Sequence, residues 1–112
     1  MNKIYRVEDE DGVGPYGRDY NVEFLESHNC DRGKHPTPYY DPGIRRECRE
    51  NEICGFLSIK QLLNWFSVNE LYKLKKCGYK LKRVEVNKIT AIGRFQCLAI
   101  RKWKPYDYNR LK

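Results

Sequence analysis

The sequence predicts a small α+β domain with a mostly antiparallel sheet and two short consecutive helices. Ser58 and Ser67 each begin a Ser-x-x-Glu/Gln pattern, which is typical of a helix N-terminus. Alternating apolar residues, typical of strands, occur on both sides of these patterns, at residues 3–8, 80–87 and 93–103. With 112 residues, 40% of them hydrophobic, the chain has room for one modest core.

The first predicted strand covers residues 3–8. In an extended chain, Ile4 and Arg6 lie on one face and Tyr5 and Val7 on the other. Arg6 is therefore expected on a half-buried face, which is an unusual place for a guanidinium.

The rest of the first half is irregular. Three glycines and a proline in residues 9–17 predict a loop whose backbone approaches a neighbouring group closely. Residues 20–25 fit a short helix or a short strand, and residues 27–52 are expected to form a long irregular loop. Residues 104–112 are expected to form a basic tail, and residues 1–112 together a single domain.

The two helices are expected over residues 59–66 and 68–77, and Gly78 is expected to end the second. Residues 89–92 fit either a bridging strand or a turn. The apolar residues expected to face the core are Ile59, Leu62, Leu63 and Phe66 in the first helix, and Leu71, Leu74 and Cys77 in the second.

The charge is unevenly distributed along the chain. Residues 1–56 carry 8 Lys/Arg against 12 Asp/Glu, whereas residues 57–112 carry 14 against 3. Such a basic block suggests nucleic acid, a nucleoprotein or an acidic protein surface as partner; a solvated surface is the alternative. The candidate binding residues of this half are Lys73, Lys75, Lys76, Lys80, Lys82, Arg83 and Lys88.

Five cysteines without Cys-x-x-Cys spacing predict reduced thiols rather than a zinc ribbon. The chain contains ligand types for Zn²⁺ in His28, Cys30, His35, Cys48 and Cys54, but their spacing matches no standard knuckle, so we expect no metal. No apolar run approaches the roughly 18 residues of a membrane span, and no signal peptide is evident. We therefore expect a cytoplasmic protein, without membrane contact.

Three residues are candidates for chemistry. Arg6 suits a phosphate or carboxylate in a cleft, or a salt bridge to Glu8, Glu85 or Asp11. Ser58 either caps a helix or faces a ligand, and Gln96 either contacts a ligand hydroxyl or amide or points to solvent. No Ser/His/Asp set, carboxylate pair or P-loop is present, so catalysis is not the favoured reading.

The order of Tyr5-Arg6-Val7-Glu8, a Gly-rich loop, Phe56-Leu57-Ser58 and a late strand through Gln96 resembles an ADP-ribosyltransferase. The resemblance implies that Arg6 holds the phosphate or ribose of NAD and that Ser58 shapes the pocket. Gln96 stands where that family has a catalytic Glu, and an amide lacks the charge of a carboxylate. Glu85, on the preceding strand, is the other candidate carboxylate.

A second resemblance covers more of the chain and includes Tyr5-Arg6-Val7, the loop Gly12-Val13-Gly14-Pro15-Tyr16, and Cys54-Gly55-Phe56-Leu57-Ser58. The frame continues through Trp65-Phe66, Gly78-Tyr79 and Gln96-Cys97, and it is similar to small phage and prophage proteins of unassigned function. This resemblance implies a viral accessory role, and Tyr16 joins Arg6 as a candidate binding residue.

Three hypotheses follow. The first is a phage accessory protein that inhibits a host defence system through its basic half. The second is an ADP-ribosyltransferase-like enzyme, or a binder of NAD or ADP-ribose, that uses Arg6, Ser58 and Gln96. The third is a structural or regulatory phage protein whose basic face joins another subunit.

Overall fold

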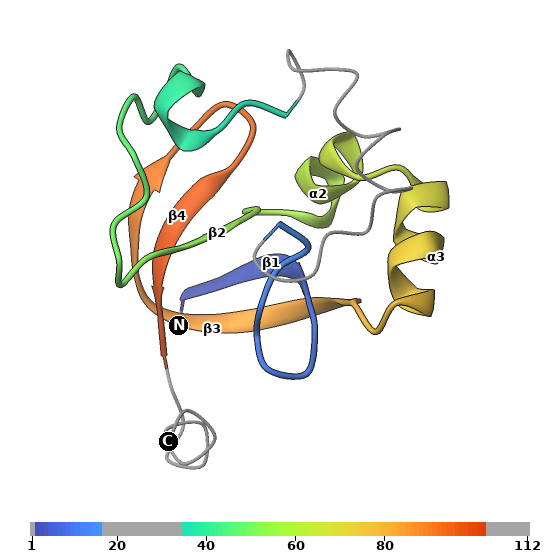
Figure 1. Ribbon diagram of the computed structural model, residues 1–112. Helices are drawn as coiled ribbons and strands as arrows, with labels where there is room; N and C mark the ends of the chain where they lie inside the picture. Colours follow the sequence, from blue (N-terminus) through green and yellow to red (C-terminus); the bar gives the residue numbers. More distant parts are fainter. Residues whose placement is uncertain (1, 17–34, 103–112) are drawn as a thin grey trace.

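The computed structural model describes residues 2–16 and 35–102, in which a curled antiparallel sheet carries two helices at one end (Figure 1). The order of the strands in the sheet is β1-β3-β4-β2, and each neighbouring pair is antiparallel. This architecture confirms the predicted α+β class. The strands are β1 (Asn2–Glu8), β2 (Ile53–Gly55), β3 (Lys80–Ile92) and β4 (Cys97–Arg101).

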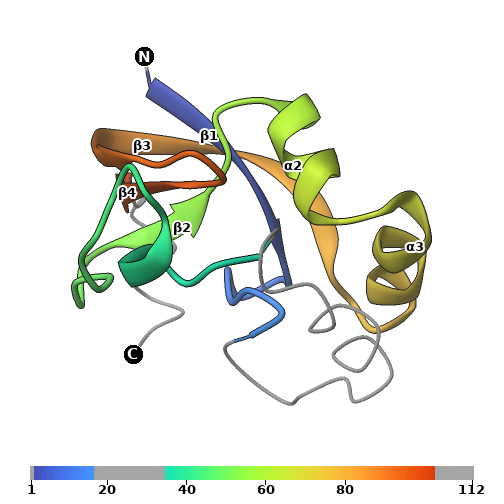
Figure 2. The same cartoon turned by 90° about the horizontal axis from the view of Figure 1, so that it is seen from above.

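The two outer strands of the sheet, β1 and β2, approach each other and curl the sheet on itself (Figure 2). Tyr5 N–H donates to Phe56 O at 2.7 Å, and Phe56 N–H donates to Tyr5 O at 2.9 Å. Gly55 permits this approach, because a Cβ there would collide with the Ile4 side chain and lie 3.0 Å from Tyr5 O.

The alternation predicted for the first strand is confirmed. Ile4 is fully buried with Val84 and Val86 in a core inside the curl of the sheet. Val7 and Tyr5, on the opposite face of β1, pack instead in the core beneath the helices.

Helices α2 (Ile59–Trp65) and α3 (Val68–Lys76) begin at the two predicted serines. The hydroxyl of Ser58 accepts a hydrogen bond from Gln61 N at 3.1 Å, and Ser67 forms a complete capping box with Glu70. Gly78 has φ of +91°, the left-handed conformation expected after a helix C-terminus.

Three residues predicted to face the core lie elsewhere. Leu63 is 42% exposed and Ile59 is 46% exposed, because the two-turn helix α2 buries only a narrow stripe through Leu62 and Trp65. Cys77 is also exposed, since it is the C-cap of α3 and no longer follows helical spacing. Tyr79, two residues later, is buried in its place.

The last two strands form a hairpin whose turn, residues 93–96, lies later in the chain than predicted. Residues 89–92 belong to β3, which crosses two register shifts, and β4 begins at Cys97 rather than at residue 93. The fully buried carboxylate of Asp41 accepts hydrogen bonds from the backbone N–H groups of Arg94 and Phe95, at 2.6 and 3.0 Å. The turn is therefore held by a residue from a distant loop, which no local pattern could show.

Between residues 35 and 52, the structure has a single 3-10 turn, Pro38–Tyr40, and otherwise irregular backbone. The element expected near residues 20–25, the first part of the 27–52 loop and the 104–112 tail lie outside the described residues.

Candidate functional site

A cavity of about 400 Å³ lies between β1, β2, the end of α2 and three loops. It brings together three predicted site residues, Arg6, Tyr16 and Gln96. We call it the Arg6 pocket. Its remaining lining residues are Val7, Gly14, Pro15, His35, Pro36, Thr37, Pro38, Cys54, Gly55, Phe56, Trp65 and Phe66.

The guanidinium of Arg6 is held in place by three neighbours. Its Nε donates to Glu8 Oε2 at 2.9 Å, its Nη1 donates to Cys54 O, and its Nη2 lies 3.4 Å from Gly12 O. Arg6 therefore forms the salt bridge with Glu8 that was one of its two readings. It also lines a pocket, and an anionic ligand on Arg6 stays a prediction. A guanidinium has five N–H bonds, so two remain for a ligand beyond these contacts with the described residues.

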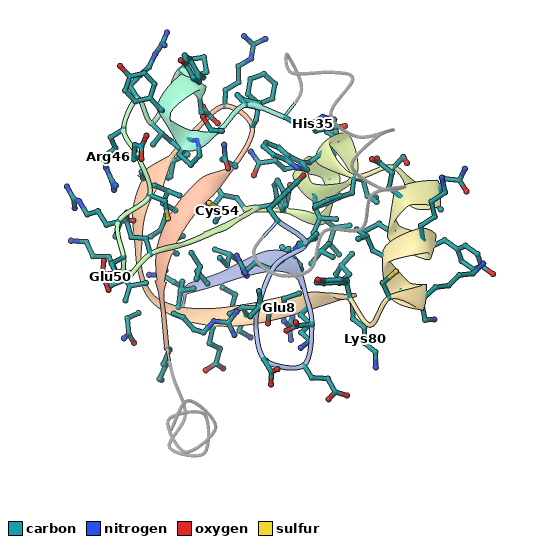
Figure 3. The ribbon with its side chains drawn as sticks, in the orientation of Figure 1. Glu8, His35, Arg46, Glu50, Cys54 and Lys80 are labelled. Carbon is teal, nitrogen blue, oxygen red and sulfur yellow. The ribbon has the colours of Figure 1, made fainter. Side chains whose placement is uncertain are left out.

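Glu8 is the centre of an ion cluster behind this pocket and is only 2% exposed (Figure 3). Arg101 donates to the same Oε2 that accepts from Arg6, and Lys82 Nζ lies 3.9 Å from Oε1. Lys82 also donates to Asp9 O at 2.9 Å. One carboxylate thus orients three cations and fixes the position of Arg6.

The walls of the pocket are aromatic. Phe56 lies 5.5 Å from Trp65 and 6.1 Å from Phe66, measured between ring centroids. His35 lies 5.3 Å from Trp65, edge to face, and donates from Nε2 to Trp65 O at 2.7 Å. Ring pairs at these separations attract each other, so the wall is rigid before any ligand arrives.

Tyr16 and Gln96 complete the lining and are both engaged with it. Tyr16 Oη accepts a hydrogen bond from Trp65 Nε1 at 3.0 Å, and burial raises the pKa of Tyr16 above its usual value. Gln96 is 3% exposed and donates from Nε2 to Pro36 O at 2.8 Å. Gln96 therefore anchors Pro36 to the turn before β4, and it does not point to solvent.

Ser58 and Glu85 do not join Arg6 and Gln96. Ser58 is exposed and caps α2, and Glu85 lines a different hollow together with Asn2, Asn87 and Lys102. Of the four residues proposed for ADP-ribosyltransferase chemistry, two line the pocket and two lie outside it.

In the part of the chain that the structure describes, the one thiol in the pocket lining belongs to Cys54. Burial raises the pKa of Cys54 to about 12, and likewise that of Cys97 in the adjacent core, so both are protonated at neutral pH. No Asp or Glu lines the pocket in the described part of the chain. The pocket as described thus offers neither a carboxylate base nor a thiolate nucleophile.

The predicted basic residues are only partly gathered. Lys75, Lys76 and Lys80 are exposed on either side of the Gly78 turn. Lys82 is turned toward Glu8 and Asp9, and Lys88 lies eight positions beyond Lys80, roughly 26 Å along an extended strand. Arg83 is exposed on β3 and Lys73 is half-buried on α3.

Apolar side chains lie among these exposed lysines. Val68 is 74% exposed and Tyr72 is 59% exposed, and Lys76 Nζ lies 4.6 Å above the Tyr72 ring. Since these three residues are spaced by four, they share one face of α3. We call this face, with the neighbouring lysines, the α3 surface: Val68, Tyr72, Lys75, Lys76 and Lys80.

Several residues that shape these sites were missed in the sequence. Glu8 and Asp41 were not predicted to be buried. Each precedes a turn that contains glycine, and the backbone N–H groups of turns need hydrogen-bond acceptors. Trp65 was not assigned to the core, although its indole N–H suits a buried site with a nearby acceptor.

Comparison with known protein families places the chain among bacteriophage proteins. The family described as "Bacteriophage T4 Y00F protein" matches residues 1–104, so the chain belongs to this family. No curated protein and no solved structure matches the chain.

The four described cysteines, Cys48, Cys54, Cys77 and Cys97, are free thiols, and Cys30 lies outside the described residues. Within residues 2–16 and 35–102, no three His, Cys, Asp or Glu side chains gather as metal ligands do. No described helix combines the length and apolar character needed to cross a membrane.

Proposed function

We propose that this phage protein inhibits a host defence system by binding an acidic surface of a host protein through the α3 surface. The observation that carries the proposal is the mixture of side chains there: exposed Val68 and Tyr72 share one face of α3 with Lys76, and exposed Lys75 and Lys80 are close to them along the chain. Family membership supports an accessory role in infection.

The mixed character of the α3 surface favours a protein partner over nucleic acid. Contacts to a phosphate backbone come from Lys, Arg and other hydrogen-bond donors, and they do not need exposed apolar side chains such as Val68. Exposed Tyr flanked by cations is instead typical of protein interfaces, where an aromatic anchor is surrounded by charged residues. The spread of Lys82 and Lys88 away from this face also weakens a continuous phosphate track.

Enzymatic ADP-ribosyl transfer is the weaker reading. Arg6 and Gln96 line one pocket, but Ser58 caps a helix and Glu85 lies in a separate hollow. We therefore propose action by binding and not by group transfer.

The test is capture of host proteins by the immobilised chain from a nuclease-treated lysate. We expect capture that survives nuclease, weakens as salt rises, and is lost in the double variant Lys75→Glu/Lys76→Glu. The matched control is Lys88→Glu, which removes an exposed lysine outside the α3 surface and should retain capture. Capture abolished by nuclease would assign nucleic acid as the partner, and equal capture by both variants would contradict the proposal.

A further inference from the structure

The Arg6 pocket has the features of a small-molecule site that the proposed function does not use. Its size falls in the range of ligand pockets, roughly 300 to 1,000 Å³, and its lining is mostly aromatic and aliphatic with few polar groups. The question is which chemistry those few polar groups select.

Among the described residues, Arg6 is the one Lys or Arg that lines the pocket, and three contacts fix its position. It is 9% exposed, and its contacts with Glu8, Cys54 O and Gly12 O hold the guanidinium plane. Its two remaining N–H bonds form a charge-assisted pair of the kind that carboxylate and phosphate oxygens accept. Glu8 also forms ion pairs with Arg101 and Lys82, so its single negative charge does not neutralise all three cations.

Two other polar side chains of the lining are partly used. One amide N–H of Gln96 is bonded to Pro36 O, and the hydroxyl of Tyr16 accepts from Trp65. Among the described lining residues, Arg6 is the one permanent cation. A dinucleotide such as NAD has two phosphates, and only one of them could pair with a guanidinium there.

The aromatic side chains define the rest of the ligand. Phe56 lies 5.5 Å from Trp65 and 6.1 Å from Phe66 between ring centroids, and all three rings line the pocket, so they favour a flat guest by stacking or edge contacts. We infer that the Arg6 pocket binds a small flat ring that carries one anionic group, with the anion on Arg6 and the ring against the aromatic wall.

The probe is 2-naphthoate, and its neutral amide, 2-naphthamide, is the matched comparison. Binding is followed by NMR through the indole N–H of Trp65, in a Trp103→Phe background that leaves a single indole signal. We expect 2-naphthoate to shift this signal saturably and to bind about 10-fold or more tightly than the amide, because a charged hydrogen bond adds roughly 1.5 kcal/mol or more.

Two variants separate the pocket from the fold. Arg6→Gln removes the anion-binding group, with Arg83→Gln as a control on the exposed face of β3. Gly14→Leu keeps Arg6 and places a side chain beside its Nη2 atom. A Cβ at Gly14 would lie 3.5 Å from that atom, which is an ordinary contact. Because Arg6→Gln removes several structural bonds, Gly14→Leu keeps the test valid if the former unfolds.

AMP and NAD are the two further probes of the binding experiment. Binding of AMP in place of, or together with, 2-naphthoate would identify a nucleoside monophosphate as the source of the same ring and anion. Tighter binding of NAD than of AMP would overturn the inference, as would equal binding of acid and amide or no shift with any probe. Unchanged 2-naphthoate binding in folded Gly14→Leu would overturn it as well.

Discussion

The Arg6 pocket and the α3 surface differ in how their residues are distributed along the chain. The α3 surface comes from residues 68–80, one helix and one turn, whereas the pocket collects residues from β1, three loops, β2 and α2. The α3 surface depends on helix capping and local charge. The Arg6 pocket depends on the curl of the sheet that brings β1 to β2. Substitutions should therefore damage them separately.

The largest effect on the pocket side is expected from Glu8→Gln. This change removes the carboxylate that Arg6 and Arg101 contact and leaves buried cations without their counter-ion. We expect a loss of about 3–5 kcal/mol in the free energy of unfolding, measured by urea denaturation. Glu85→Gln, outside the cluster, is the control, and a loss for Glu8→Gln no larger than that of the control would contradict the role of the cluster.

Glu52, which lies directly before β2, should make the free energy of unfolding depend on pH in acid. Bidentate hydrogen bonds from Arg46, at 2.7 and 2.8 Å, lower the pKa of Glu52 from 4.5 to about 2. Since this pKa is lower in the folded state, the stabilisation is present above pH 4.5 and is lost as pH falls toward 2.

Glu52→Gln should lower the free energy of unfolding at neutral pH by about 1–3 kcal/mol and flatten its dependence on pH between 5 and 2. The measurement is urea denaturation at a series of pH values. An unchanged pH profile in the variant would show that other carboxylates cause the acid response.

A smaller effect is expected from Ser58→Ala, which distinguishes a cap from a pocket residue. Loss of the hydrogen bond to Gln61 N should cost about 1 kcal/mol of stability. Binding of 2-naphthoate should remain at the wild-type level, because Ser58 is outside the Arg6 pocket. Weakened binding in a folded variant would return Ser58 to the site.

The smallest effect on stability is expected from Lys75→Glu/Lys76→Glu. Both side chains are exposed, so thermal unfolding should show a change within about 0.5 kcal/mol. A large loss of stability would mean that the lysines support the fold, and lost host-protein capture would then have another cause.

Local signals allowed much of the fold to be predicted. The two serine caps, the Gly78 terminus and the alternation in β1 depend on neighbouring residues, and the structure confirms them. The exposure of Leu63 depends on which side of α2 meets the sheet, and this is set by distant residues.

The candidate sites, like the fold, could be predicted only in part. The sequence predicted Arg6, Tyr16 and Gln96 as candidates, and the structure brings them into one pocket. It named Glu8 as one of three possible partners of Arg6. It did not indicate the contact of Glu8 with Arg101 or the role of Trp65, because these contacts cross 93 and 49 positions of the chain. The sequence also did not show that Lys82 turns away from the other lysines, because its partner Asp9 lies 73 positions away.

The most direct test of two separate binding surfaces is a pair of readings on one variant, Gly14→Leu. We predict that the folded variant loses the 2-naphthoate shift at Trp65 and captures host protein from nuclease-treated lysate as wild type does. Loss of both activities in the folded variant would contradict the account, because it would show that the Arg6 pocket and the α3 surface act as one site.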